Sequence, residues 1–153
     1  FIPFGTGDLY KNIIIRNTKE LDKKVYSKRF FGDKKILMNC NFMGASNNRK
    51  TSKMKMLYSA FQDKTIYHTN NNIIKPLIEK NSCGGLSEVE IVNERYIDSA
   101  IEISNYFNMN CEPSGISGLA LFLQRIDKNQ MTINLNDKII IINTGKSATA
   151  NYY

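Results

Sequence analysis

The sequence predicts an α/β protein with an open, mostly parallel, twisted sheet flanked by helices. Segments typical of strands alternate with segments typical of amphipathic helices. The stretch Lys138–Asn143 contains an unbroken run of isoleucines, which is typical of a strand buried on both faces. The 153 residues, 42% of them hydrophobic and 23% charged, are enough for a single domain with its own core.

The beginning of the chain predicts a strand, a turn and a helix. Phe1–Phe4 is apolar and resembles the end of a buried strand. Gly5–Gly7 follows as a tight turn, and a helix begins near Asp8, because apolar residues recur at Leu9 and Ile13.

The middle of the chain is more polar and less regular. Lys35–Asn39 is predicted to be a second strand, and Met43–Thr51 a polar loop. Ser52 is predicted to cap a short helix. The apolar stripe of that helix consists of Met54, Leu57, Tyr58 and Phe61.

The carboxyl-terminal half has the most regular pattern. Leu86–Val92 alternates in the manner of a strand, and Asn93 is predicted to be the N-cap of the next helix. Cys111–Gly115 ends that helix, because it contains a proline and a glycine. The apolar stripe of the helix consists of Tyr96, Ala100, Ile103 and Phe107.

A further helix is predicted to begin at Ser114 or Ser117, followed by a final strand over Lys138–Asn143 that ends at Thr144 and Gly145. The helix has one apolar face, formed by Leu119, Phe122, Leu123 and Ile126.

The formal net charge is +7, and the positive excess lies toward the amino terminus. Residues 1–65 carry 14 basic and 5 acidic side chains, whereas residues 66–153 carry 7 basic and 9 acidic ones. An anionic partner would explain this excess, and so would a solvated, lysine-rich surface. A nucleic-acid-binding protein is less favoured, because the basic residues are not interleaved with aromatic side chains that stack on bases.

The cysteines and the histidine predict no metal site. Cys40, Cys83 and Cys111 form no CxxC pair, and His68 has no cysteine at ligand spacing. Free thiols are typical of a reducing compartment, so we expect a cytoplasmic protein. No apolar run reaches the roughly 18–20 residues of a membrane helix, so no membrane partner is expected.

Three turns rich in glycine and hydroxyl residues are candidates for binding an anion. Gly5–Gly7 lies between a predicted strand and helix, where backbone N–H groups can hold a phosphate, although ordinary tight turns share this pattern. Thr144 follows the last predicted strand, and Cys111–Gly118 joins two helices. Open α/β sheets bind ligands at the carboxyl ends of their strands, so the three turns together are more informative than any one.

The segment Glu112–Ala120 resembles the EPSGAAGLA-type segment of the fold type II pyridoxal-phosphate enzymes, which include threonine synthase, threonine and serine dehydratases and the cysteine synthases. Gly84–Tyr106 resembles a strand and helix of threonine synthase, and Ile139–Gly145 its terminal strand ending in Thr-Gly. Gly5–Leu9 resembles the glycine loop that holds the cofactor phosphate. The resemblance runs from residue 5 to residue 145, and residues 17–81 match only in outline.

This resemblance implies pyridoxal 5′-phosphate as the cofactor. Thr144 would face its pyridine nitrogen with a neutral hydroxyl, which does not force protonation of the ring as a carboxylate would. Glu112 and Ser114 would shape the wall near the ring, unless Ser114 only caps its helix. The phosphate would be held by the backbone N–H groups of Gly5, Thr6, Gly7, Asp8 and Leu9.

Two positions depart from the pattern of the family. Asp8 places a carboxylate beside the proposed phosphate, which is repulsive unless the side chain points away and caps the helix. Lys146–Ala148 replaces the usual glycine-containing continuation after Thr-Gly. The choice among synthase, dehydratase and other lyases is therefore open.

The resemblance also implies that residues 1–153 form one carboxyl-terminal segment of such an enzyme. The Schiff-base lysine of the family lies before the phosphate loop, so no residue of this chain is assigned as catalytic. We therefore expect a preceding segment or companion chain, an amino-acid substrate, elimination or replacement chemistry in amino-acid biosynthesis, and a homodimer as one assembly. The alternatives are a catalytically degenerate relative that binds a phosphorylated ligand or a partner and, less favoured, a nucleic-acid-binding protein.

Overall fold

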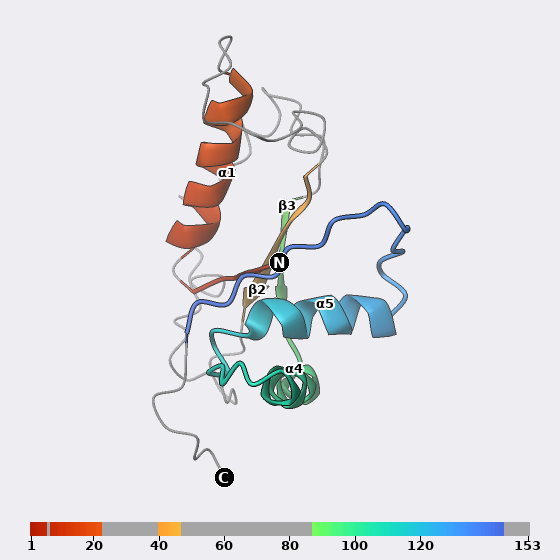
Figure 1. Cartoon of the computed structure of the whole chain (residues 1–153). Helices are drawn as coiled ribbons and strands as arrows, with labels where there is room; N and C mark the ends of the chain where they lie inside the picture. The colour runs from red at the N-terminus through yellow and green to blue at the C-terminus, as the bar shows by residue number, and fades with distance from the viewer. Residues whose placement is uncertain (6, 23–39, 47–86, 146–153) are drawn as a thin grey trace.

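The computed structural model describes residues 1–5, 7–22, 40–46 and 87–145 (Figure 1). The described residues form three parallel strands and three helices, which confirms the predicted α/β class. Two strands and three helices lie where the sequence predicts them, at the start of the chain and after residue 86. The elements are β1 (Ile2–Pro3), α1 (Asp8–Asp22), β2 (Phe42–Ser46), β3 (Ser87–Ile91), α4 (Glu94–Tyr106) and α5 (Ser117–Asp127).

The three strands form one open sheet in the order β1-β2-β3, and both pairs are parallel. Ile2 lies opposite Gly44, and Gly44 lies opposite Val89. Because the strands are parallel, their carboxyl ends lie along one edge of the sheet. The predicted turn Gly5–Gly7 follows the carboxyl end of β1 at that edge.

The predicted polar loop Met43–Thr51 is wrong at its beginning, because β2 occupies that part of the chain and all its residues are buried. Gly44 lies in the middle of β2, where a Cβ atom would be 3.0 Å from the Val89 side chain and 3.3 Å from the Tyr10 ring. The glycine therefore allows β2 and α1 to pack closely. In the sequence alone, the same small residue is typical of a loop.

The helices cover both faces of the sheet and give three layers (Figure 1). α1 lies on one face, and α5 lies on the other with α4 packed beside it. Successive strand residues point to opposite faces, so the core divides into two clusters. The first, under α1, contains Ile2, Phe4, Tyr10, Ile14 and Phe42. The second, under α4 and α5, contains Met43, Ala45, Val92, Tyr96, Ile97, Ala100, Cys111, Ile116, Ala120 and Leu121.

Asn93 caps α4, as the sequence predicts. Its side-chain oxygen accepts a hydrogen bond from the Arg95 N–H at 3.2 Å. The buried side chain of Gln124, in α5, connects this cap to the sheet through two hydrogen bonds. Its Oε1 accepts from the Asn93 N–H at 2.8 Å, and its Nε2 donates to the Ile91 carbonyl at 3.1 Å.

Both carboxyl-terminal helices end with an asparagine in the left-handed conformation. Asn108 has φ 57° after α4, and Asn129 has φ 53° after α5. The next N–H in each case bonds to a carbonyl five residues earlier at 2.8 Å, which closes a Schellman motif. These bonds run from Met109 to Ser104 and from Gln130 to Arg125.

α5 begins at Ser117, one of the two predicted starts, but its most buried face differs from the predicted apolar face. Leu119 and Leu123 are only partly buried, and Ile126 is exposed. Small residues bring the helix close to β1, since a Cβ on Gly118 would lie 2.9 Å from the carbonyl oxygen of residue 1. The buried face consists of Ser117, Gly118, Ala120, Leu121 and Gln124.

The predicted buried strand Lys138–Asn143 is wrong as stated. The segment is not part of the regular sheet, and Ile140 is 70% exposed. It nevertheless runs parallel to β1, because the Phe1 ammonium donates to the Ile140 carbonyl at 2.8 Å and the Ile142 N–H donates to the Phe1 carbonyl at 3.0 Å. Burial lowers the pKa of the Phe1 amino group below its ordinary value, and Cys40 partly opposes this effect.

Some predicted elements lie outside the described residues, namely the strand Lys35–Asn39 and the helix capped by Ser52. None of the helices in the described part of the chain is long and apolar enough to cross a membrane.

Candidate functional site

The first predicted turn connects β1 to α1. Gly7 has φ 88°, a conformation that favours glycine. Its carbonyl accepts the Lys11 N–H at 2.9 Å, which forms the first turn of the fifteen-residue helix α1. The first backbone N–H groups of a helix have no partner within the helix, and they carry its positive dipole end. Gly5 and Gly7 therefore lie where an anion can be bound, and Thr6 lies outside the described residues.

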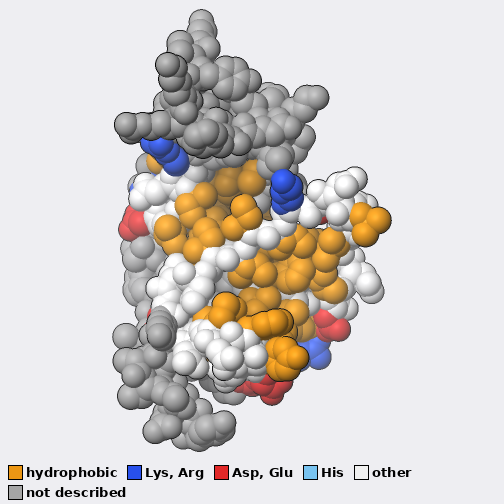
Figure 2. All heavy atoms as spheres, in the orientation of Figure 1, with side chains coloured by type: hydrophobic (Ala, Val, Ile, Leu, Met, Phe, Trp, Pro, Cys, Tyr) orange, Lys and Arg blue, Asp and Glu red, His pale blue; other side chains and the backbone are white. Residues whose placement is uncertain are grey.

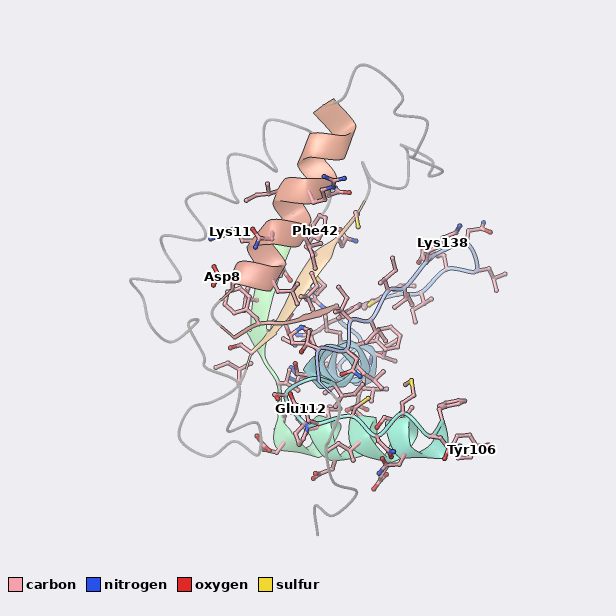
Figure 3. The ribbon with its side chains drawn as sticks, turned by 60° about the vertical axis from the view of Figure 1, so that its left-hand side comes forward. Asp8, Lys11, Phe42, Tyr106, Glu112 and Lys138 are labelled. Carbon is pink, nitrogen blue, oxygen red and sulfur yellow. The ribbon has the colours of Figure 1, made fainter. Side chains whose placement is uncertain are left out.

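Asp8 and Leu9 are exposed in the first turn of α1. Figure 3 shows Asp8 at this end of the helix. Lys11 Nζ donates to Asp8 Oδ1 at 3.2 Å, and the Asp8 side chain is 64% exposed. The nearby ammonium group partly offsets the carboxylate charge. The repulsion that Asp8 would exert on a bound phosphate is reduced by this pairing and by solvent.

Glu112 and Ser114 lie in the turn between α4 and α5, where Figure 3 labels Glu112. The Ser114 hydroxyl donates to Glu112 Oε1 at 3.0 Å, and Ser114 itself is buried. The Ser117 hydroxyl donates to the Ser114 carbonyl at 3.0 Å. Ser114 is therefore engaged in orienting the Glu112 carboxylate and does not cap α5, which begins three residues later.

This turn, residues 112–115, packs against residues 143–145, and we call their contact the junction. The Glu112 N–H donates to the Gly145 carbonyl, and the Thr144 N–H donates to the Gly115 carbonyl, both at 3.3 Å. A Cβ on Gly115 would lie 2.6 Å from the Gly145 nitrogen, so the backbones approach too closely for a larger residue. The structure thus brings together Glu112, Ser114 and Thr144, which the sequence assigns to one site.

The Thr144 side chain is exposed at the junction. Within the described residues, its hydroxyl has no hydrogen-bond partner, so it is accessible to a ligand. Gly5 and Gly145 follow two parallel segments, and Figure 1 shows that these segments end on the same side of the molecule. The first turn and the junction therefore lie at one edge of the sheet.

Two residues that hold the junction together are not among the predicted site residues. Asn143 Nδ2 donates to Cys111 Sγ at 3.0 Å, and Asn143 Oδ1 accepts from the Gly145 N–H at 3.1 Å. A polar residue directly after the apolar run Ile139–Ile142 is a signal that could have pointed to Asn143. No spacing in the sequence indicates its contact with Cys111, because the two residues are 32 positions apart.

No family model, no curated protein and no solved structure matches this chain. Across residues 1–5, 7–22, 40–46 and 87–145, no three His, Cys, Asp or Glu side chains are grouped so that they could hold a metal ion. The geometry of the first turn and the junction is therefore the basis for assigning a function.

Proposed function

We propose that this chain forms the cofactor-binding, carboxyl-terminal part of a pyridoxal-phosphate-dependent lyase or synthase, similar to threonine synthase. The enzyme would act on an amino acid by elimination or replacement. One observation carries the proposal: the turn with Glu112 and Ser114 packs directly against Thr144. These segments resemble one enzyme family separately in the sequence, and their contact in the fold supports a shared site.

The turn before α1 fits the phosphate of this cofactor. Gly7 has no side chain and a left-handed φ, so the backbone can approach a ligand closely. The dipole and N–H groups at the start of a helix favour a bound anion. We assign the phosphate to the backbone N–H groups of Gly5, Thr6, Gly7, Asp8 and Leu9.

The Thr144 hydroxyl is the group that we assign to the pyridine nitrogen. It is exposed, and the backbone of Thr144 is held by its hydrogen bond to Gly115. A hydroxyl can donate or accept a hydrogen bond and carries no charge. When bound, the cofactor supplies an electron sink for carbanion chemistry. Glu112, oriented by Ser114, would form the adjacent wall.

The proposal includes a companion polypeptide or further segment that supplies the Schiff-base lysine and contacts to the amino-acid substrate. Exposed apolar residues support a surface for such a partner. Figure 2 shows hydrophobic side chains gathered over α5 and the neighbouring segment that runs along β1. Ile126, Ile139 and Ile140 belong to these two parts of the chain and are exposed.

Binding of pyridoxine 5′-phosphate, measured by calorimetry, tests the proposal. This probe carries an alcohol in place of the aldehyde, so it cannot react with lysine side chains. We expect it to bind more tightly than pyridoxine, which lacks the phosphate. Gly7→Ala should weaken binding of the phosphorylated probe about tenfold, because the strained turn would move N–H donors away from the anion.

Asn129→Ala is a matched control for Gly7→Ala. It also places alanine at a positive φ, 53°, but at the far end of α5. We expect it to lower stability and leave the affinity for the probe unchanged. Equal affinity for the two pyridoxine compounds, or binding of neither, would contradict the proposed function.

A second candidate is a catalytically degenerate relative that only binds a phosphorylated small molecule. It is favoured by one observation: no lysine of this sequence has the context of a Schiff-base residue. In that case inorganic phosphate should bind as tightly as pyridoxine 5′-phosphate, because the ring would contribute nothing. A nucleic-acid-binding protein would instead bind oligonucleotides with an affinity that falls steeply with salt.

A further inference from the structure

Asn143 lies at the centre of the junction. Its Oδ1 accepts the Gly145 N–H at 3.1 Å, which closes an Asx turn around Thr144. Its Nδ2 donates to Cys111 Sγ at 3.0 Å on the other side of the junction. One side chain therefore connects the segment that carries Thr144 to the residue that precedes Glu112.

The orientation of the Asn143 amide follows from its partners. A backbone N–H can only donate, so the atom that faces Gly145 must be the oxygen. The Cys111 thiol donates to the Met109 carbonyl at 2.9 Å, which leaves a sulfur lone pair to accept from Nδ2. All three hydrogen bonds are compatible with this single orientation of the amide.

The position of Thr144 depends on these contacts. Its N–H is bound to the Gly115 carbonyl, and the Asx turn fixes the peptide groups on both sides of it. A Cβ on Gly115 would lie 2.7 Å from Asn143 Oδ1, so the amide is packed closely against the turn. The exposed Thr144 hydroxyl is therefore attached to a backbone that Asn143 holds in place.

We infer that Asn143 is a positioning residue that sets the place of the Thr144 hydroxyl and, through it, the affinity for a ligand with an aromatic ring nitrogen. The inference rests on the proposed function, because it takes the pyridine nitrogen as the partner of Thr144. Asn143 acts through the backbone of residues 144 and 145 and needs no contact with the ligand.

Two probes separate this role from a merely structural one: pyridoxine 5′-phosphate and its 1-deaza analogue, in which C–H replaces the ring nitrogen. Asn143→Ala should raise the dissociation constant of the first probe about 3–10-fold and leave that of the analogue unchanged. In a Thr144→Val background, Asn143→Ala should have no further effect. Additive losses, or equal losses for both probes, would overturn the inference.

Hydrogen exchange of the Gly145 amide, followed by NMR, tests the same contact without a ligand. Asn143→Ala should speed this exchange, and Asn143→Asp, which keeps an acceptor oxygen, should restore protection. Both variants should fold, because Asn143 is exposed. Unchanged exchange in Asn143→Ala would overturn the positioning role.

The two hypotheses fail in different ways. If the wild-type chain binds neither probe, the proposed function is wrong, and so is the inferred effect of Asn143 on ligand affinity. If the wild-type chain binds the nitrogen-containing probe but Asn143→Ala does not weaken that binding, only the inference about Asn143 is wrong.

Discussion

At the scale of single residues, Gly115 and Gly145 meet in the junction but should tolerate substitution differently. A methyl group on Gly115 would lie 2.6 Å from the Gly145 nitrogen, and only a backbone shift could relieve this overlap. On Gly145 it would meet the Glu112 side chain, which can rotate away with loss of its hydrogen bond from Ser114. Gly115→Ala should lower the free energy of unfolding by about 2–3 kcal/mol, and Gly145→Ala by about 1 kcal/mol.

Urea unfolding followed by circular dichroism measures both changes. Ser99→Ala, at an exposed position of α4, is a control that should change stability little. Equal losses for Gly115→Ala and Gly145→Ala would contradict the distinction between a backbone contact and a flexible side-chain contact.

At the scale of the elements, the left-handed asparagines that end α4 and α5 give a second prediction. Asn108→Ala and Asn129→Ala should each lower the free energy of unfolding by about 1 kcal/mol, because a Cβ without a compensating polar group disfavours positive φ. Asn108→Gly and Asn129→Gly should leave stability unchanged or raise it, since glycine adopts this conformation without strain.

Asn105→Ala is the matched control for these caps, because Asn105 lies inside α4, where alanine is the better helix former. Thermal unfolding of the five variants tests the prediction. A loss in the glycine variants as large as in the alanine variants would mean that the asparagine side chains, and not the backbone conformation, stabilise the helix ends.

The elements also show what the sequence could and could not predict. α1, β3 and α4 carry clear signals, namely apolar periodicity, strand alternation and the N-cap Asn93. β2 was missed because Gly44 and its polar neighbours are typical of a loop, whereas the close contacts of Gly44 with Val89, Phe4 and Tyr10 appear only in the fold. The run Ile139–Ile142 does not form the predicted buried strand, because hydrophobicity alone does not determine which side of a segment another element covers.

The candidate site shows the same difference between signals in the local sequence and contacts made only in the fold. The family resemblance assigns Glu112, Ser114 and Thr144 to one site, and the structure shows that their segments are in contact, while their role in binding a ligand stays a prediction. The contact between Asn143 and Cys111 was missed because it joins positions far apart in the sequence. Local chemistry is therefore visible in one sequence, whereas the contacts that hold it in place require the fold.

At the scale of the whole molecule, exposed isoleucines predict association through the surface formed by α5 and residues 138–142. Ile140 is 70% exposed and Ile126 is 38% exposed. Contact with a partner would remove this apolar surface from water, which is favourable. The isolated chain should therefore associate with itself as its concentration rises. Ile140→Ser should weaken this association, and sedimentation velocity over a range of concentrations measures it.

Ile140→Ser should change the free energy of unfolding of the monomer by less than about 0.5 kcal/mol, because the side chain is mostly solvated before the substitution. Lys138→Ser, in the same segment, is a control that removes a charge and leaves the apolar surface intact. A companion polypeptide that binds this surface should compete with self-association and be weakened by the same Ile140→Ser change. A chain that stays monomeric at all concentrations, with Ile140→Ser indistinguishable from the wild type, would remove the evidence for a partner at this surface.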